Sequence, residues 1–206
     1  TLDLTPVSEL KSIRCDYNQL TTLVLSSGLI TLNCKNNRLK WLDLSPAPEL
    51  TELRCDENKL TALDLSPVPE LNSINCADNK LTALDLSPVP GLKSVDCVGN
   101  KLSTLVLSSG LTTLNCGNNR LKWLDLSPAP KLTELSCDEN KLTALDLSPV
   151  PELTELSCNL NKLTVLDLSP VPELKSISCG RNKLTTIVLS SGLTTLSCRI
   201  NRLKWL

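Results

Sequence analysis

The chain has 206 residues, 41% of them hydrophobic, which is enough to bury the core of one domain or of two small ones. Its 21 Lys and Arg nearly balance its 22 Asp and Glu, which argues against a nucleic-acid surface or an acidic tail. It has no His, Met or Phe, and aromatic residues make up only 2%. Because His is the commonest general base, most familiar enzyme mechanisms are disfavoured. No apolar run approaches the roughly 18 residues of a membrane span.

An internal repeat is marked by ten cysteines that are always 19 or 21 residues apart: Cys15, Cys34, Cys55, Cys76, Cys97, Cys116, Cys137, Cys158, Cys179 and Cys198. Three residues after each cysteine comes an asparagine. The long unit reads LxxLxCxxNxLxxLDLSPxPx, and in the short unit SSG replaces SPxPx. One short and three long units span 82 residues, and the block that begins at Cys34 recurs at Cys116 and Cys198. With no linker in view, we expect a single array over residues 1–206.

The LxxLxCxxNxL pattern resembles the leucine-rich repeat family, in the bacterial form whose 21-residue unit carries a second apolar LxL segment. The resemblance covers the whole chain. It implies a right-handed solenoid with a parallel sheet on one face, and binding of other macromolecules in place of catalysis. The family's variable face is usually diverse in sequence, whereas here it reads as monotonous.

Side-chain alternation predicts how each coil is built. At 53–55 the Leu and Cys side chains point inward and Arg points outward, and at 63–65 two Leu flank an outward Asp. We therefore predict an all-β solenoid of about ten coils, with two short parallel strands per coil and few or no helices. At a stacking distance of about 4.8 Å it would form a rod roughly 45 to 50 Å long.

The turns and the interior have structural explanations. Stacked Asn amides can satisfy the backbone groups of successive corners in a hydrogen-bonded ladder. The glycines of the SSG units, Gly28, Gly110 and Gly192, are expected at tight corners. Each cysteine takes the slot where this repeat type more often has Leu, so it is expected to be a small buried hydrophobe with a protonated thiol. Disulfides between coils are not expected, because in-register parallel strands hold neighbouring Cβ atoms side by side. We predict no catalytic residue, no metal site and no cofactor.

Two charged columns follow from the period. The acidic column is expected to point outward, and calcium binding is its alternative to solvent exposure: Asp3, Asp43, Asp64, Asp85, Asp125, Asp146 and Asp167. At the short units Val24, Val106 and Val188 interrupt it. The basic column either discourages aggregation or attracts an acidic partner: Arg38, Lys59, Lys80, Lys101, Arg120, Lys141, Lys162, Lys183 and Arg202.

One set of residues recurs once per 82 residues and is the candidate partner-binding surface: Arg38, Lys40, Trp41, Arg120, Lys122, Trp123, Arg202, Lys204 and Trp205. Trp and Arg are enriched at interface hot spots, and a cation beside an indole also suits a glycan. The alternative is that each Trp only packs on its neighbours. Successive Trp residues would lie about 19 to 20 Å apart along the stack.

The chain starts and finishes in the middle of a coil and has no divergent polar cap, so we expect either an excerpt of a longer array or head-to-tail association of copies. Our first interpretation is a non-catalytic structural or adhesive rod, extracellular or on a cell surface, which assembles with itself into fibres. The alternative is a binding module for a protein or glycan that uses the Trp, Arg and Lys set. An enzyme and an engineered consensus scaffold are the other classes we weighed. We expect neither nucleic-acid binding nor membrane insertion.

Overall fold

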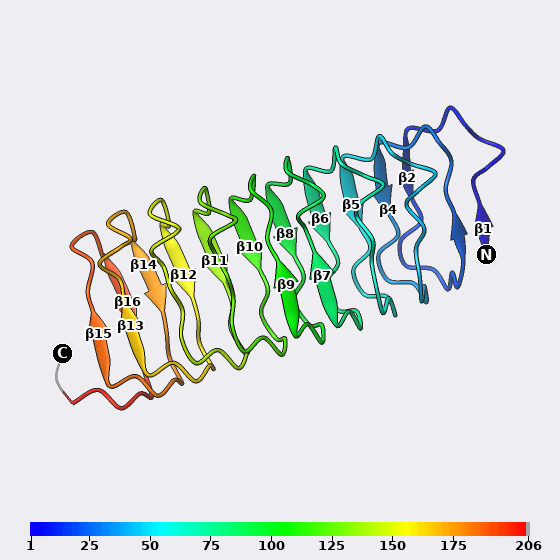
Figure 1. The fold of residues 1–206 in the computed structure, drawn as a ribbon. Coiled ribbons are helices and arrows are strands. Elements are labelled where there is room, and N and C mark those ends of the chain that lie inside the picture. The colour runs from blue at the N-terminus through cyan, green and yellow to red at the C-terminus, as the bar shows by residue number, and fades with distance from the viewer. Residues whose placement is uncertain (205–206) are drawn as a thin grey trace.

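The computed structural model describes residues 1–204, which form a stack of coils with strands and no helix (Figure 1). Most strands are three residues long. They are β1 (Leu2–Asp3), β2 (Ser12–Arg14), β3 (Leu23–Val24), β4 (Thr31–Asn33), β5 (Glu52–Arg54), β6 (Ser73–Asn75), β7 (Ala83–Asp85), β8 (Ser94–Asp96), β9 (Thr104–Val106), β10 (Thr113–Asn115), β11 (Glu134–Ser136), β12 (Glu155–Ser157), β13 (Val165–Asp167), β14 (Ser176–Ser178), β15 (Thr186–Val188) and β16 (Thr195–Ser197). The predicted all-β solenoid is confirmed.

One parallel sheet runs the length of the molecule, in the order β2-β4-β5-β6-β8-β10-β11-β12-β14-β16. Equivalent residues of successive coils pair in register, so that Leu53 lies beside Ile74 and Ile74 beside Val95. These middle residues are at most 1% exposed, and the residues on either side of them are less buried. Each coil therefore contributes the strand that ends just before its cysteine.

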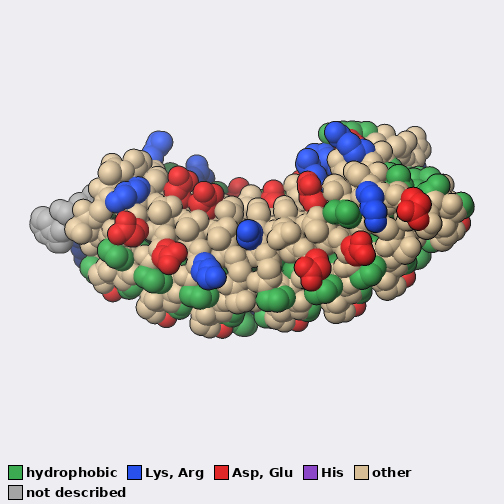
Figure 2. Space-filling view, turned by 90° about the horizontal axis from the view of Figure 1, so that it is seen from above, with side chains coloured by type: hydrophobic (Ala, Val, Ile, Leu, Met, Phe, Trp, Pro, Cys, Tyr) green, Lys and Arg blue, Asp and Glu red, His purple; other side chains and the backbone are tan. Residues whose placement is uncertain are grey.

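Within residues 1–204, the second strand predicted in every coil forms in six places. It pairs as β1 with β3, β7 with β9 and β13 with β15, and each pair joins a long coil to the short coil that follows it. The stack is an arc and not a straight rod, with the ten-stranded sheet lining its hollow (Figure 2). On the outer side of an arc, neighbouring coils spread beyond the strand spacing of about 4.8 Å. At two of these places the corner of the short coil is bonded to the preceding long coil, through the Ser108 hydroxyl to the Val89 carbonyl oxygen and the Ser190 hydroxyl to the Val171 carbonyl oxygen.

The interior is one continuous hydrophobic cluster of stacked Leu, Ile, Val, Ala and Cys side chains. Nine of the ten cysteines are buried, Cys198 is half-buried, and all ten thiols are free. No coil could bury its own leucines, because each one packs on the coils before and after it. The cysteines thus form a ladder of sulfurs inside the stack, as predicted from the repeat.

The asparagine ladder is also confirmed. The Asn119 side chain donates to the carbonyl oxygens of Cys97, at 3.0 Å, and of Cys116, at 3.1 Å. Its Oδ1 accepts a hydrogen bond from the Leu102 N–H at 2.9 Å. One amide therefore ties two coils together and satisfies backbone groups that the turn leaves unpaired.

The corners differ between long and short coils as the sequence predicts. In a long coil the residue between the two prolines, such as Val89, is fully buried, and its N–H donates to the Leu86 carbonyl oxygen at 3.1 Å. In the next, short coil Ser108 is buried and donates its hydroxyl to the Val89 carbonyl oxygen. A Cβ on Gly110 would collide with the Pro90 carbonyl oxygen, so the close approach of the coils requires glycine there.

Candidate functional site: the sheet face and its edge

Four positions in each coil reach the outer face of the ten-stranded sheet or its carboxyl edge. They are the third and first residues before each cysteine and the first and second residues after it, and we refer to them as the sheet-face columns. Their composition changes from coil to coil. The residues directly after the cysteines, for example, are Asp16, Lys35, Asp56, Ala77, Val98, Gly117, Asp138, Asn159, Gly180 and Arg199. The expectation of a monotonous face was therefore wrong.

The two complete 82-residue blocks, 34–115 and 116–197, show where the sequence varies. They differ at 18 positions, and ten of these lie in the sheet-face columns. The ten positions, numbered in the second block, are Gly117, Ser136, Glu155, Ser157, Asn159, Leu160, Ser178, Gly180, Arg181 and Ser197. The columns account for only 16 of the 82 positions, so the differences between the blocks concentrate on this face.

The second residue after each cysteine has a left-handed backbone in every coil. Gly99 has φ 69°, and the other nine have φ between 49° and 58°: Tyr17, Asn36, Glu57, Asp78, Asn118, Glu139, Leu160, Arg181 and Ile200. This conformation costs an L residue roughly 1 to 2 kcal/mol, and Asn, Asp and Gly tolerate it best. Sequence reasoning missed this turn, although Asn, Asp or Gly at four of the ten positions gave a signal for it.

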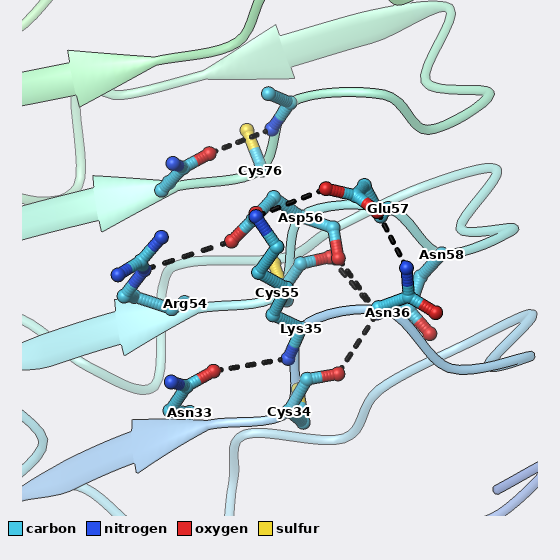
Figure 3. Close-up of polar contacts among 12 residues, drawn as sticks. Asn33, Cys34, Lys35, Asn36, Arg54, Cys55, Asp56, Glu57, Asn58 and Cys76 are labelled. Atoms are coloured by element: carbon cyan, nitrogen blue, oxygen red, sulfur yellow. Dashed lines mark hydrogen bonds and ion pairs between the residues drawn. The ribbon is translucent and has the colours of Figure 1, made fainter. Parts of the chain in front are cut away.

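A cluster of charges lies on this edge in the first block (Figure 3). The Lys35 ammonium group is 2.9 Å from a Glu57 oxygen and 3.1 Å from an Asp56 oxygen. These bonds raise the pKa of Lys35, and the bonds that Glu57 accepts from Lys35 and from the Asn36 amide lower the pKa of Glu57. Asp56 is only 3% exposed, and its other oxygen lies 3.7 Å from Nε of Arg54. The cluster fixes the edge of the sheet at β4 and β5.

The second block replaces these cations by small residues and holds the acid differently. Asp138 accepts hydrogen bonds from the Ser157 hydroxyl, at 2.8 Å, and from the Asn159 backbone N–H, at 2.6 Å. Oδ1 of Asn159 then accepts bonds from the Ser178 hydroxyl, at 3.0 Å, and from the Gly180 N–H, at 2.7 Å. The same fold position is thus rebuilt with neutral donors, which changes the charge of the face without changing its backbone.

The hollow of the arc has an uneven charge. A cavity of about 290 Å³ lies over β10, β11, β12 and β14, in the half of the sheet nearer β16, and the exposed Glu134 and Glu155 stand side by side there on paired strands. Arg14 lies on the sheet near one end, and Arg181 and Arg199 near the other. Figure 2 shows basic side chains at both ends of the hollow and acidic ones between them. A partner that docks here would meet a pattern of charge along the arc.

The Trp, Arg and Lys set predicted from the sequence lies elsewhere. Its residues run from the asparagine turn to the position of the second strand in the coil, so they do not lie on the ten-stranded sheet. Trp41 is 56% and Trp123 59% exposed, and each follows a short coil whose valine, Val24 or Val106, interrupts the acidic column. The basic members are exposed as well: Arg38, Lys40, Arg120, Lys122, Arg202 and Lys204. Trp205 lies outside the described residues.

The acidic column points outward, as predicted, but it also has a local role. Asp64 Oδ1, for example, accepts a hydrogen bond from the Ser66 N–H at 2.9 Å, which caps the turn into the Ser-Pro corner. Such bonds lower the pKa of six members of the column: Asp3, Asp43, Asp64, Asp125, Asp146 and Asp167. Within residues 1–204 no three Cys, Asp or Glu side chains converge as metal ligands would.

Burial makes the thiols poor nucleophiles. It raises the pKa of Cys76 and of Cys116 to about 12, and that of Cys15 and of Cys179 to about 11. These sulfurs therefore stay protonated at neutral pH, and the thiolate is the reactive form.

Across the described chain, no helix has the length and apolar character that crossing a bilayer requires.

This repeat and this solenoid define the chain as a leucine-rich repeat protein. It is similar in structure to the functional domain of InlJ from Listeria monocytogenes, which includes a cysteine ladder, with a TM-score of 0.92 and 36% sequence identity over 100% of this chain and 48% of that one. It is also similar to YopM from Yersinia enterocolitica, with a TM-score of 0.82 and 26% identity over 99% of this chain and 49% of that one. The chain thus spans about half the length of both.

The fold also occurs in a receptor complex. The ectodomain of the plant membrane receptor kinase GASSHO1/SCHENGEN3 from Arabidopsis thaliana, in complex with CASPARIAN STRIP INTEGRITY FACTOR 2, has a TM-score of 0.83 and 20% identity over 98% of this chain and 29% of that one. At that identity the likeness concerns the fold alone. No protein-family model matches the chain, and neither does any curated protein sequence.

Proposed function

We propose that this chain is a non-catalytic binding module that binds another protein on the outer face of its ten-stranded sheet. The observation that carries the proposal is the uneven divergence of the two blocks, ten of whose 18 differences fall in the sheet-face columns. Packing of the hydrophobic core does not account for this pattern, because the side chains of the sheet-face columns lie outside the core cluster. A surface that varies over a constant scaffold is what recognition of a specific partner requires.

The geometry of the sheet supports a protein partner over a small ligand. The hollow is open and extends over many strands, and its polar side chains stand on a rigid sheet, which limits the ordering cost of binding. Similar folds have been solved in complexes, including the plant receptor described above and the LRIM1/APL1C complex, which has a TM-score of 0.64. We infer from such neighbours that the module acts outside the cell or on its surface, which protease shaving of intact source cells would test.

A selection experiment tests this function. Protein domains displayed on phage are selected on the intact chain and then tested against Glu134→Arg/Glu155→Arg, which reverses the charge of the acidic part of the hollow. We expect the selected domains to lose at least tenfold in affinity for this variant and to keep their affinity for Trp41→Ala/Trp123→Ala/Trp205→Ala. Domains that keep binding to the sheet variant and lose it on the tryptophan variant would overturn the proposal.

That opposite outcome would support the second candidate, in which the Trp, Arg and Lys set captures a protein or glycan. The exposure of Trp41 and Trp123 favours it, because an indole that only packed on its own coil would be covered. A self-assembling structural or adhesive rod makes a third prediction. Its fibres, seen by electron microscopy, would survive replacement of all three tryptophans by alanine, whereas partner capture through them would not.

A further inference from the structure

The carboxyl edge of the sheet carries a second hollow near its last strands. This groove has a volume of about 310 Å³ and is lined by Asn159, Leu160, Gly180, Arg181, Ser197, Arg199 and Ile200. These residues follow or end strands β12, β14 and β16, so they come from three consecutive coils. Gly180 leaves room in it, since an added Cβ would lie 3.2 Å from both the Arg199 carbonyl oxygen and Oδ1 of Asn159.

All seven lining residues differ from their equivalents one block earlier. Those equivalents, 82 positions upstream, are Ala77, Asp78, Val98, Gly99, Asn115, Gly117 and Asn118. Because the two blocks agree at most other positions, the groove is the place where this copy of the repeat has changed most completely. The changes remove one acid and the Val98 side chain, and they add two arginines and two larger apolar side chains, Leu160 and Ile200.

The apolar residues occupy unfavourable backbone positions. Leu160 has φ 55° and is 41% exposed, and Ile200 has φ 58° and is 65% exposed. Asp78 and Asn118, at the matching positions, suit the left-handed conformation better, and a β-branched residue there is especially disfavoured. Bulky apolar groups held in strained positions with their surfaces exposed fit a contact with a partner.

The charges of the groove indicate what that partner carries. Arg181 and Arg199 are both exposed, and neither forms an ion pair within the described part of the chain. No carboxylate lines the groove itself. On the neighbouring coil, Asp138 is occupied by Ser157 and Asn159, and the exposed Glu139 lies on the far side of Leu160. Carboxylates of a partner would therefore sit over the two arginines, away from Glu139.

We propose that this groove binds an extended, acidic segment of a partner protein and seats an apolar side chain of that segment against Leu160 and Ile200. This proposal narrows the kind of protein that the sheet binds, and it rests on the proposed function of the sheet. The arginines select the charge of the segment, and the leucine and isoleucine select its apolar anchor.

A designed peptide tests the proposal directly. The probe is a fluorescein-labelled decapeptide in which Asp and Leu alternate. One control peptide alternates Lys and Leu, and the other alternates Asp and Ser. By fluorescence anisotropy we expect the Asp-Leu peptide to bind the whole chain at least tenfold more tightly than either control. Equal affinity for the Lys-Leu peptide would overturn the charge assignment, and equal affinity for the Asp-Ser peptide would overturn the apolar anchor.

The repeat supplies a matched variant that keeps the fold. In Leu160→Asp/Arg181→Gly/Arg199→Gly/Ile200→Asn each new residue already occupies the same backbone position one block earlier, so the stack is retained. We expect at least a tenfold loss of Asp-Leu peptide binding, with an unchanged circular dichroism spectrum. Binding at the original affinity would place the peptide elsewhere and contradict the proposal.

The reciprocal transplant tests for gain of function. Introducing the seven groove residues at positions 77, 78, 98, 99, 115, 117 and 118 of the otherwise unchanged chain should create a second groove, so that calorimetry finds two peptides per chain in place of one. A stoichiometry that stays at one would contradict the assignment. If the groove variants leave binding of the Asp-Leu peptide unchanged while Glu134→Arg/Glu155→Arg releases the selected domains, the groove proposal fails and the proposed function of the sheet stands.

Discussion

Two columns of side chains only one residue apart obey opposite rules. The asparagine three residues after each cysteine is present in every coil, while the residue just before it is Tyr, Asn, Glu, Asp, Gly, Leu, Arg or Ile. The asparagine is directed into the stack, where its amide holds two coils, and its neighbour is turned outward by a left-handed backbone. The molecule thus separates the residues that build the array from the residues that give it a particular surface, and it does so within a single turn.

Removing one internal amide should have the largest effect on stability. Asn119→Ala leaves the Leu102 N–H and the Cys97 carbonyl oxygen without their partner in a buried site. We expect the free energy of unfolding to fall by about 3 kcal/mol, as measured by urea denaturation. The control is Asn118→Gly, next door on the outer column, which should change stability by less than about 1 kcal/mol. Equal losses in the two variants would refute the division.

A polar atom in the sulfur ladder should have the next largest effect. Cys116→Ser places a hydroxyl in a fully buried slot, and we expect a loss of about 2 kcal/mol. Cys116→Ala, which adds no polar group, should lose less. Thermal denaturation with and without a reducing agent gives a further check, because free thiols predict the same midpoint in both. A midpoint that falls on reduction would mean that the sulfurs are bonded in pairs.

Acid should lower the stability of the folded chain through carboxylates on its outer surface. The hydrogen bonds at the Ser-Pro corners hold the pKa of Asp43, Asp64 and Asp125 below the ordinary value of 3.8. Carboxylates with a lowered pKa stabilise the folded chain above that value, and this stability is lost as the pH falls through the folded pKa. The free energy of unfolding should therefore drop between about pH 5 and pH 3.

The triple variant Asp43→Asn/Asp64→Asn/Asp125→Asn serves as the matched control for the acid experiment. Asparagine keeps a side-chain oxygen for the corner N–H and removes the titration. We expect its stability to fall less steeply over the same pH range. A slope identical to that of the unsubstituted chain would show that other groups control the acid sensitivity.

The smallest effect should come from a half-buried acid on the sheet. Burial raises the pKa of Asp96, so the folded protein holds its charged form less favourably than the unfolded chain does. Asp96→Asn keeps the acceptor for the Val98 N–H and matches the Asn33, Asn75 and Asn115 of the same column. We expect a gain of about 0.5 kcal/mol or less at pH 7 that vanishes below the ordinary pKa of Asp. Lower stability at pH 7 would contradict this assignment.

The interior could be predicted from sequence because the period fixes it. Leu, Cys and Asn recur at invariant spacing, and strand alternation then decides which of them point inward. The intermittent second strands could not be predicted, since they depend on the curvature of the whole stack, which only coil packing sets. The left-handed turn was missed for a related reason, because Leu160 and Ile200 occupy a conformation that their own propensities disfavour.

The sequence and the structure draw attention to different surfaces. Rarity within the repeat drew attention to Trp41 and Trp123, and the structure places both of them away from the sheet. The variation on the sheet was visible in the sequence, but only the fold identifies the four positions per coil that share a face. Once those columns are known, the differences between the blocks can be placed on one face of the sheet, and the proposed function rests on that placement.

The central claim is that the sheet-face columns carry the binding function, and two chimeras test it most directly. In one, the ten column residues of 116–197 are replaced by those of 34–115, and in the other, the eight remaining differences are exchanged. The measurement is the Kd of a domain selected on the intact chain. Binding weakened at least 100-fold in the first chimera and retained in the second is the expected result, and the reverse result would contradict the account.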